Sequence, residues 1–221
     1  MPTLKRKIIN GLKFLLEIIW DGIIVILFVI VIRSYIIAPF QIHGPSMCDT
    51  FNNLNGQCIR GNGEYIMVYK LGYQNIGGWQ IGIPKRGDIV VFQPPNGIGD
   101  EFFIKRVIGL PGETIEIKEG YVYINTKRLD ESSYLNKSNL GHTDTQKNET
   151  IFVIPQGQYF VLGDNRRASS DSRRCFDQIG CTTNNTPFVP LANLQGKAFI
   201  VLWPFNQIRL SKEVDYTLSS K

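Results

Sequence analysis

The chain has 221 residues, of which 43% are hydrophobic and 19% charged, and its net charge is +5. This composition excludes disorder for the bulk of the chain, and the length allows one sizeable domain plus a membrane segment. Residues 1–40 hold five basic and two acidic residues and so carry +3 of the net charge. The near-neutral remainder lacks the basic stripe that a nucleic-acid binder needs, so no nucleic-acid partner is expected.

Residues 18–38 form the first predicted element, a transmembrane anchor. Their uninterrupted apolar run, Gly22–Ile32, is too short to span a bilayer alone. The flanking residues extend it to about 20, enough to cross if the end charges reach the interfaces. Pro39 then ends the helix.

The charges before this segment predict its direction. Lys5, Arg6, Lys7 and Lys13 precede it, and the positive-inside rule keeps that end in the cytoplasm. Residues 1–17 are therefore expected to be a cytoplasmic, basic and amphipathic segment, and residues 39–221 an extracytoplasmic domain on a single-pass protein of the cytoplasmic membrane. The alternative is a cleaved signal peptide, but no small-x-small cleavage site follows, which favours a retained anchor.

Short β-rich runs separated by turn residues follow Phe40. The predicted strands are 64–69, 88–92, 102–108, 114–118, 121–125, 158–162 and 197–203, with a hairpin turn at Glu119-Gly120. Residues 126–150 are polar and are expected to be an insertion that leaves the core. Strands without long intervening helices predict a mainly β fold, an antiparallel or barrel-like domain behind one N-terminal helix.

Lys105 is a candidate general base. In the predicted strand 102–108 it shares a face with Phe103 and Val107. Burial among apolar neighbours would lower its pKa from about 10.4 towards neutrality, and a neutral amine can activate a serine. The alternative is a lysine at a sheet edge that reaches water.

Ser46 lies in Gly44-Pro45-Ser46-Met47, a sharp bend directly after the anchor that would expose the hydroxyl and main-chain N–H groups. The alternative is an ordinary loop serine. A histidine-based triad is disfavoured: His43 is only three residues from Ser46, and His142 lies in the polar insertion.

Four cysteines form two close pairs, Cys48/Cys58 and Cys175/Cys181. Two local disulfides, free thiols and a metal site are all open. An oxidising compartment favours disulfides, and the spacings are not those of zinc knuckles. The sequence gives no signal for a metal or a cofactor.

Four stretches, in order, resemble the type I signal peptidases, membrane-bound serine/lysine peptidases that remove signal peptides from exported preproteins. They are Ser46-Met47 with Thr50, the run 86–92 (RGDIVVF), the run 105–113 (KRVIGLPGE), and Gly163-Asp164-Asn165-Arg166 with Ser169, Asp171, Ser172 and Arg173. The resemblance extends from the anchor to Trp203.

This resemblance implies roles for the matching residues. Ser46 would be the nucleophile and Lys105 the base, Ser169 would hydrogen-bond the lysine amine, and Asp171 and Arg173 would form a supporting ion pair. Gly44 stands where relatives place an oxyanion donor, so main-chain N–H groups or water must serve. Small residues at positions −1 and −3 of an extended signal peptide would bind in pockets lined by Phe40, Ile42 and Ile104. The expected partners are preprotein signal peptides and the lipid bilayer, with the protein acting as a monomer.

The loop after Ser46 departs from the family pattern. Asp49 replaces the usual proline, and residues 52–63 look inserted. We expect a Cys48–Cys58 disulfide to replace the missing stiffness of the nucleophile loop, and a Cys175–Cys181 disulfide to close a second loop near residues 175–190. Two other functions stay open: a self-cleaving Ser/Lys peptidase, against which the anchor argues, and a catalytically silent, membrane-tethered β module.

Overall fold

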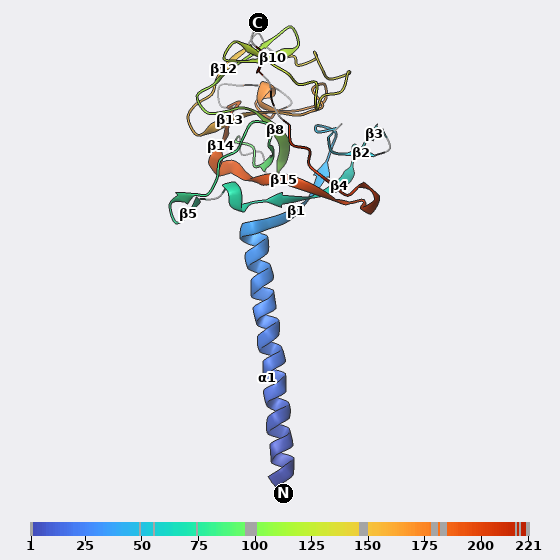
Figure 1. The fold of residues 1–221 in the computed structure, drawn as a ribbon, viewed down its shortest axis with the longest axis vertical. Coiled ribbons are helices and arrows are strands. Elements are labelled where there is room, and N and C mark those ends of the chain that lie inside the picture. The colour runs from blue at the N-terminus through green and yellow to red at the C-terminus, as the bar shows by residue number, and fades with distance from the viewer. Residues whose placement is uncertain are drawn as a thin grey trace.

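The computed structural model describes residues 2–48, 50–54, 56–73, 75–95, 101–145, 150–177, 181, 185–214, 216 and 218–219. A long N-terminal helix stands below a β domain, and the two chain ends lie at opposite ends of the molecule (Figure 1). The paired strands run antiparallel, as in the β1–β4, β4–β15 and β7–β8 ladders. This confirms the predicted fold class, a mainly antiparallel β domain behind one helix.

The helix α1 (Pro2–Val31) continues into a π-helical turn, η1 (Ile32–Ile36). Its large apolar side chains are exposed on all sides, a pattern that suits lipid rather than water. Residues Ile8–Ile36 are long and apolar enough to cross a membrane. The amphipathic segment before residue 18 therefore extends the same helix, which ends at Ile36. Ile37 and Ala38, which the predicted anchor 18–38 included, belong instead to β1, because they pair with Tyr69 and Val68 of β4. Pro39 lies within strand β1, where its backbone is extended like that of the residue before it.

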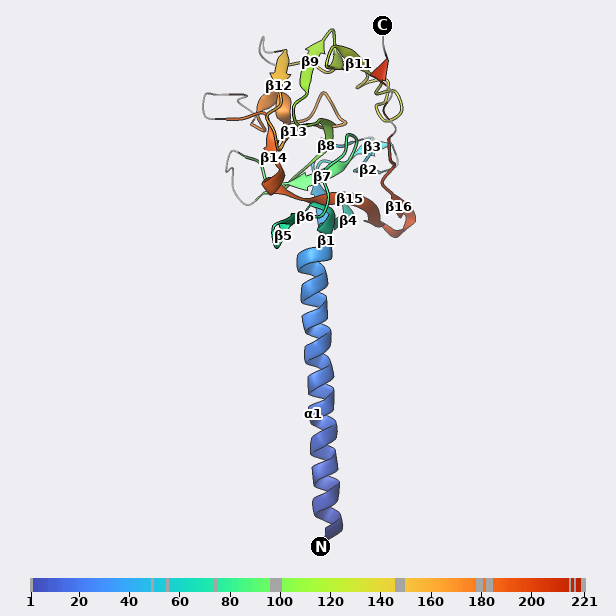
Figure 2. The same ribbon diagram turned by 60° about the vertical axis from the view of Figure 1, so that its left-hand side comes forward.

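The main sheet has eight strands in the order β1-β4-β15-β7-β8-β13-β14, with β16 beside β15. Two views show it above the end of the helix (Figures 1 and 2). The strands are β1 (Ile37–His43), β4 (Asn62–Tyr69), β7 (Ile89–Phe92), β8 (Phe103–Gly109), β13 (Gln158–Leu162), β14 (Val189–Pro190), β15 (Leu194–Trp203) and β16 (Arg209–Leu210). Because β1 is at the edge, one side of it is open to an added strand.

A second sheet lies at the end of the domain farthest from the helix (Figure 2). Its order is β12-β9-β10-β11-β17, formed by β12 (Ile151–Val153), β9 (Thr114–Lys118), β10 (Tyr121–Ile124), β11 (Lys127–Leu129) and β17 (Leu218–Ser219). Two small hairpins join β2 (Asn53–Leu54) to β3 (Gln57–Cys58) and β5 (Asn75–Ile76) to β6 (Trp79–Gln80). Short 3-10 turns complete the fold: η2 (Leu71–Tyr73), η3 (Ser172–Arg174), η4 (Leu191–Asn193) and η5 (Phe205–Gln207).

Strand β8 is buried on both faces because three apolar clusters meet along it. Ile104 belongs to the cluster under β1 and β4, Val107 to a cluster between β7 and β13, and Ile108 to the cluster beneath the second sheet. The sequence pattern predicts apolar neighbours for Lys105, and the fold buries this lysine in a strand that contributes to all three clusters.

The polar segment after residue 126 packs more closely than expected. Leu129 and Leu135 are buried. The buried carboxylate of Glu131 pairs with Arg166 at 2.6 Å, and Arg166 also donates to Thr143. The expectation that residues 126–150 leave the core is therefore wrong for residues 127–145, because a buried ion pair ties them to the domain. Residues 146–149 lie outside the described part of the chain.

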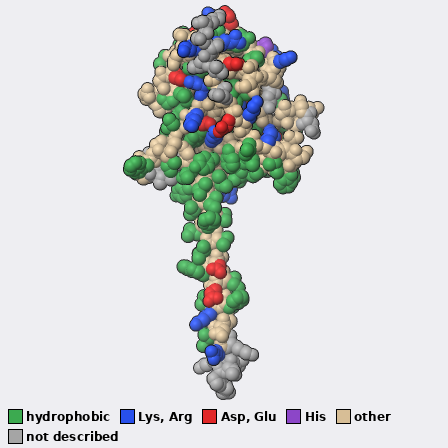
Figure 3. Space-filling view, in the orientation of Figure 1, with side chains coloured by type: hydrophobic (Ala, Val, Ile, Leu, Met, Phe, Trp, Pro, Cys, Tyr) green, Lys and Arg blue, Asp and Glu red, His purple; other side chains and the backbone are tan. Residues whose placement is uncertain are grey.

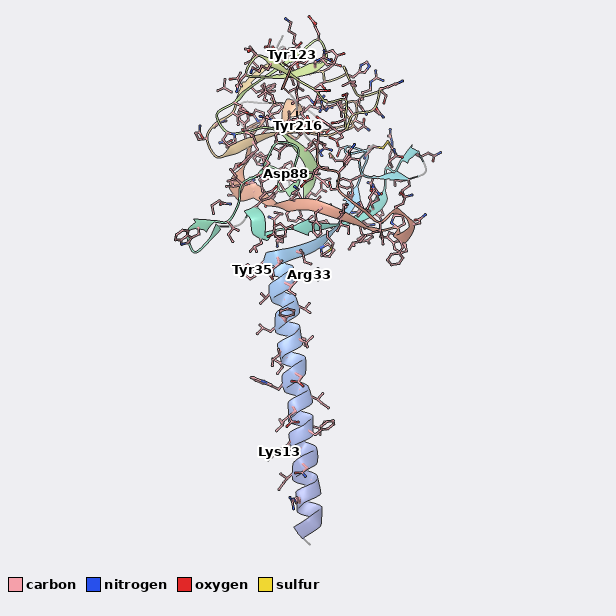
Figure 4. All side chains as sticks on the ribbon, in the orientation of Figure 1. Lys13, Arg33, Tyr35, Asp88, Tyr123 and Tyr216 are labelled. Atoms are coloured by element: carbon pink, nitrogen blue, oxygen red, sulfur yellow. A yellow bond between two sulfur atoms is a disulfide. The ribbon has the colours of Figure 1, made fainter. Side chains whose placement is uncertain are left out.

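Large apolar side chains are exposed where the domain meets the helix. Figure 3 shows a continuous hydrophobic band there. We call its two ends, on the β5–β6 hairpin and at the β15–β16 turn, the apolar rim: Trp79, Ile81, Ile83, Trp203 and Phe205, which are 48–81% exposed. Arg33 and Tyr35, at the top of the helix, lie just beneath this band (Figure 4).

Candidate active site

Ser46 lies in a tight turn directly after the edge strand β1. Gly44 begins the turn at φ +82°, a conformation that favours glycine. The Cys48 N–H then donates to the Pro45 carbonyl at 3.0 Å. The turn leaves Ser46 half-buried, between the buried Met47 and the opening of a groove.

Lys105 reaches Ser46 from β8. Its Nζ lies 2.9 Å from Ser46 Oγ and donates to the Ile104 carbonyl at 2.8 Å. The side chain is 3% exposed. Burial lowers the pKa of Lys105 to about 8, against the opposing attraction of Asp171 and Asp164. The two residues that the sequence singled out are thus within hydrogen-bond distance, and the amine is easier to deprotonate than an ordinary lysine.

The Asp171–Arg173 ion pair is present, as expected. Two of the arginine nitrogens donate to the two carboxylate oxygens at 2.9 and 2.8 Å, and the Gly163 N–H donates to Asp171 at 3.0 Å. Burial acts to raise the pKa of Asp171, but the attraction of Arg173 and these hydrogen bonds hold it below its ordinary value. Asp171 thereby stays charged near the lysine.

Ser169 is buried beside Gly163. A Cβ on Gly163 would collide with Ser169 Oγ and come within 2.5 Å of the Ser46 carbonyl. Only glycine at position 163 therefore lets the segment 163–173 approach the turn that carries Ser46 so closely. The buried Ser169 Oγ makes no hydrogen bond among the residues that the structure describes, so the expected bond from Ser169 to the Lys105 amine is not formed here.

Asn165 is a site residue to which the sequence analysis assigned no role. Its main-chain N–H donates to the Ser46 carbonyl at 3.0 Å, and its Nδ2 donates to the Pro45 carbonyl at 3.1 Å. The residue lies in the stretch Gly163-Asp164-Asn165-Arg166 that carried the family resemblance. Sequence spacing could not identify Ser46 as its partner, because Ser46 lies 119 residues earlier in the chain.

A buried ion pair behind the site was also missed. Arg106 donates to both oxygens of Asp164, at 2.8 and 2.6 Å, and both side chains are almost fully buried. Thr50 donates to the same carboxylate and accepts from Arg106 at 3.3 Å. The pair joins β8, the segment after β13 and the nucleophile loop at one point.

A groove of about 640 Å³ passes over Ser46 and Lys105. The three predicted pocket residues, Phe40, Ile42 and Ile104, all line it, as does Gly44. Its other lining residues are Gln41, His43, Ile66, Val91, Glu101, Phe102, Phe103 and Ser170. His142 does not line it; this exposed residue lies 3.5 Å from Arg167. The edge strand β1 forms one wall, so an extended peptide could bind alongside it.

Both predicted disulfides are present. Cys48 is bonded to Cys58 and Cys175 to Cys181, with Cα–Cα distances of 5.7 and 4.9 Å. The free-thiol and zinc alternatives are therefore wrong for these cysteines. Asp49, which replaces the usual proline, lies outside the described part of the chain.

Known proteins resemble this chain over most of its length. The sequence model of the family described as "Signal peptidase, peptidase S26" matches residues 15–203. Signal peptidase I S of Bacillus subtilis is 31% identical over 93% of this chain and 98% of its own. Signal peptidase IB of Staphylococcus aureus is 34% identical over 89% and 94%. A crystal structure of a signal peptidase I from Enterococcus faecalis shares 34% identity over 52% of this chain and 96% of that chain, with a TM-score of 0.38.

Proposed function

Because the chain belongs to the signal peptidase family, peptidase S26, we propose that it is a signal peptidase I, a serine endopeptidase that removes signal peptides from exported preproteins. The observation that carries this proposal is the 2.9 Å contact between Ser46 Oγ and the buried Lys105 Nζ at the base of a groove. A nucleophile and a base within hydrogen-bond reach are what acyl transfer requires.

The proposed mechanism uses Lys105 in its neutral form. The amine accepts the Ser46 proton as Oγ attacks the scissile carbonyl, then donates it to the leaving amine. Lys105 next activates a water that releases the acyl group from Ser46. Asp171, paired with Arg173, keeps the amine pKa from falling further.

The oxyanion would be bound by main-chain groups. Gly44 offers no side-chain hydroxyl, so we assign the Ser46 N–H as one donor and a water or second main-chain N–H as the other. The Asn165 bonds to Pro45 and Ser46 fix this peptide segment, which preorganises the donor before substrate arrives.

The proposed substrate lies extended along β1. Ile42 and Ile104 are 3% and 9% exposed, and with Phe40 they form an apolar part of the groove wall. We propose that this wall has shallow depressions between these side chains. Such depressions suit small side chains at positions −1 and −3, and the exposed edge of the strand supplies main-chain hydrogen bonds.

We also propose the membrane arrangement. Residues 18–36 span the bilayer and residues 1–17 extend into the cytoplasm. Residues 37–221, which begin with strand β1, form the catalytic domain outside. The helix, exposed on all sides, and the apolar rim at the base of the domain support it (Figure 3). This places Ser46 ten residues beyond the helical segment that ends at Ile36, close to the membrane surface where a signal peptide emerges.

A processing assay tests the proposal. Purified full-length protein should cut a preprotein after an Ala-x-Ala sequence, and Ser46→Ala and Lys105→Ala should each lower kcat by at least about 10³-fold. Ser132→Ala and Lys118→Ala, both on exposed surface, are matched controls that should cut normally.

The other candidate functions give different results. A silent β module would cut no preprotein, and a self-cleaving peptidase would fragment its own chain in the absence of substrate. Cutting that survives Lys105→Ala would show that Lys105 is not the base.

A further inference from the structure

The ladder between β1 and β4 is interrupted just before the nucleophile turn. Gln41 pairs with Tyr65 and His43 with Asn62, so Ile42 alone faces both Gly63 and Glu64. An extra residue of this kind breaks the hydrogen-bond ladder and redirects the strand. The interruption lies four residues before Ser46, at the point where the chain leaves the sheet to form the turn.

The amide of Asn52 bridges this interruption. Its Oδ1 accepts from the Glu64 N–H at 2.8 Å on β4, and its Nδ2 donates to the Ile42 carbonyl on β1 at 3.3 Å. The same Nδ2 donates to the Gly44 carbonyl at 3.0 Å. One side chain therefore replaces a missing backbone pair and also holds the first residue of the nucleophile turn.

The surroundings are built to fit this side chain. Asn52 is fully buried at φ +59°, a conformation that asparagine tolerates better than most residues. A Cβ on Gly63 would collide with its Oδ1 and come within 2.5 Å of its Nδ2. The Ile59 N–H donates to its carbonyl at 2.9 Å. Its hydrogen-bonding groups are thus all occupied, as a buried amide requires.

Glu64 and Arg209 hold Asn52 from the other side. The buried Glu64 carboxylate accepts from the Asn52 N–H at 2.8 Å. Arg209, on β16, donates to both Glu64 oxygens at 2.7 and 2.9 Å and to the Thr50 carbonyl at 2.9 Å. A bidentate pair fixes both position and orientation.

We propose that Asn52 is a positioning residue for catalysis, held by Glu64 and Arg209, that sets the geometry of the turn carrying Ser46. The inference rests on the proposed function. It gives a definite role to the loop that departs from the family pattern, since Asn52 acts through the Gly44 carbonyl and touches neither substrate nor the reacting atoms.

Loss of the Asn52 amide should affect turnover more than binding. Without Nδ2 the Gly44 carbonyl loses its partner and the Ser46 turn can rotate relative to Lys105. The groove wall should change less. Ile42 loses the bond from Asn52 but stays buried in the apolar cluster that also holds Ile104 and packs against Phe40. A displacement of about 1 Å at a reacting centre costs about 100-fold in rate, whereas peptide affinity depends mainly on this wall.

Asn52→Gly is the variant to test, because glycine adopts φ +59° without strain and lacks the whole side chain that carries the amide. In the full-length protein we expect kcat to fall about tenfold to 100-fold, with KM within about twofold of wild type. Arg209→Lys should give a smaller fall in kcat, since lysine keeps the charge but not the bidentate geometry. Asn193→Gly is the matched control: its Nδ2 donates to the Gln93 carbonyl at 3.0 Å, and neither of these residues lines the groove over Ser46.

The outcomes separate this inference from the proposed function. If wild type and Asn193→Gly cut preprotein but Asn52→Gly keeps full kcat, the positioning role is wrong and the proposed function stands. The positioning role is also wrong if Asn52→Gly and Asn193→Gly each lose kcat in proportion to their loss of thermal stability. If wild type cuts no preprotein, the proposed function itself fails. Should Asn52→Gly not fold, Arg209→Lys decides by the same kcat and KM comparison.

Discussion

At the scale of single residues, the site depends on a conflict between burial and charge at Lys105. A lysine that is 3% exposed is costly to keep protonated, and burial dominates the shift of its pKa to about 8. Asp171 and Asp164 act in the opposite direction, because their charges favour the ammonium form. The balance leaves an amine that can lose its proton under mild conditions and remains basic enough to accept one from a serine.

This balance predicts the pH dependence of activity. Lys105 acts as a base only when neutral, and it is protonated below its pKa of about 8. We expect kcat/KM to rise about tenfold per pH unit below that value and to level off above it. Rates of preprotein cutting between about pH 6 and 10, with thermal unfolding measured at each pH as the control, check this. A flat profile through this pKa in a folded enzyme would contradict the role of Lys105.

At the scale of elements, the loop after Ser46 is held by contacts from distant parts of the chain. Asn165, in the segment after β13, donates hydrogen bonds to the carbonyls of Pro45 and Ser46, where the loop begins. Thr50, within the loop, contacts the buried Arg106–Asp164 pair. The Cys48–Cys58 disulfide closes the loop on itself. We propose that these cross-links supply the stiffness that the usual proline gives in related chains.

The disulfide beside the nucleophile should matter for both stability and rate. We expect Cys48→Ser/Cys58→Ser to lower the free energy of unfolding by about 2–4 kcal/mol, because the unfolded chain gains freedom. Since Cys48 is two residues from Ser46, kcat should fall as well. Chemical denaturation and the processing assay measure the two effects.

The second disulfide supplies the control for this prediction. Cys175→Ser/Cys181→Ser removes a bridge between cysteines that are six residues apart instead of ten. This bridge follows the Asp171–Arg173 pair and is not adjacent in sequence to Ser46. Its removal should lower stability with a smaller loss of kcat. Full activity and stability in the Cys48→Ser/Cys58→Ser variant would show that this disulfide does not stiffen the loop after Ser46.

At the scale of the whole molecule, the apolar rim lies on the side of the domain from which the apolar helix extends (Figure 3). The helix is exposed all round, and Trp79 and Trp203 are 81% and 48% exposed at the base of the domain. Tryptophan prefers the interface between membrane and water. The groove would then lie near the bilayer surface, with the second sheet turned away from it (Figures 1 and 3).

Fluorescence quenching by bromine-labelled lipids tests this arrangement in the reconstituted full-length protein. Variants that keep only Trp79 or only Trp203, with the other two tryptophans changed to phenylalanine, should both be quenched. Tyr123→Trp in a chain without the three native tryptophans is the control, because Tyr123 lies at the far end of the domain (Figure 4). Unquenched Trp79 and Trp203 would show that the rim stays away from the bilayer.

The local patterns of the chain predicted the helix and the strands β4, β7, β8, β9, β10, β13 and β15, but not the edge strand β1. They made Ser46 and Lys105 candidates, and the family resemblance supplied the roles of these two residues. An apolar run marks the helix, alternation marks the strands, and Lys105 is conspicuous between apolar neighbours. The prediction for the polar segment failed because composition cannot show that Glu131 will be buried against Arg166. Polarity alone does not distinguish a solvated loop from one closed by a buried ion pair.

The sequence by itself determined an apolar N-terminal helix, a β domain and the residue types of a serine–lysine pair, since these follow from short-range periodicity and from motifs a few residues long. The tertiary structure alone decided the 2.9 Å contact between Ser46 and Lys105, the burial of β8 on both faces and the hold of Asn165 and Asn52 on the nucleophile turn. These depend on strand order and on a bulge in the β1–β4 ladder. Distances between segments so far apart in the chain are set by how the sheet closes, which no local pattern encodes.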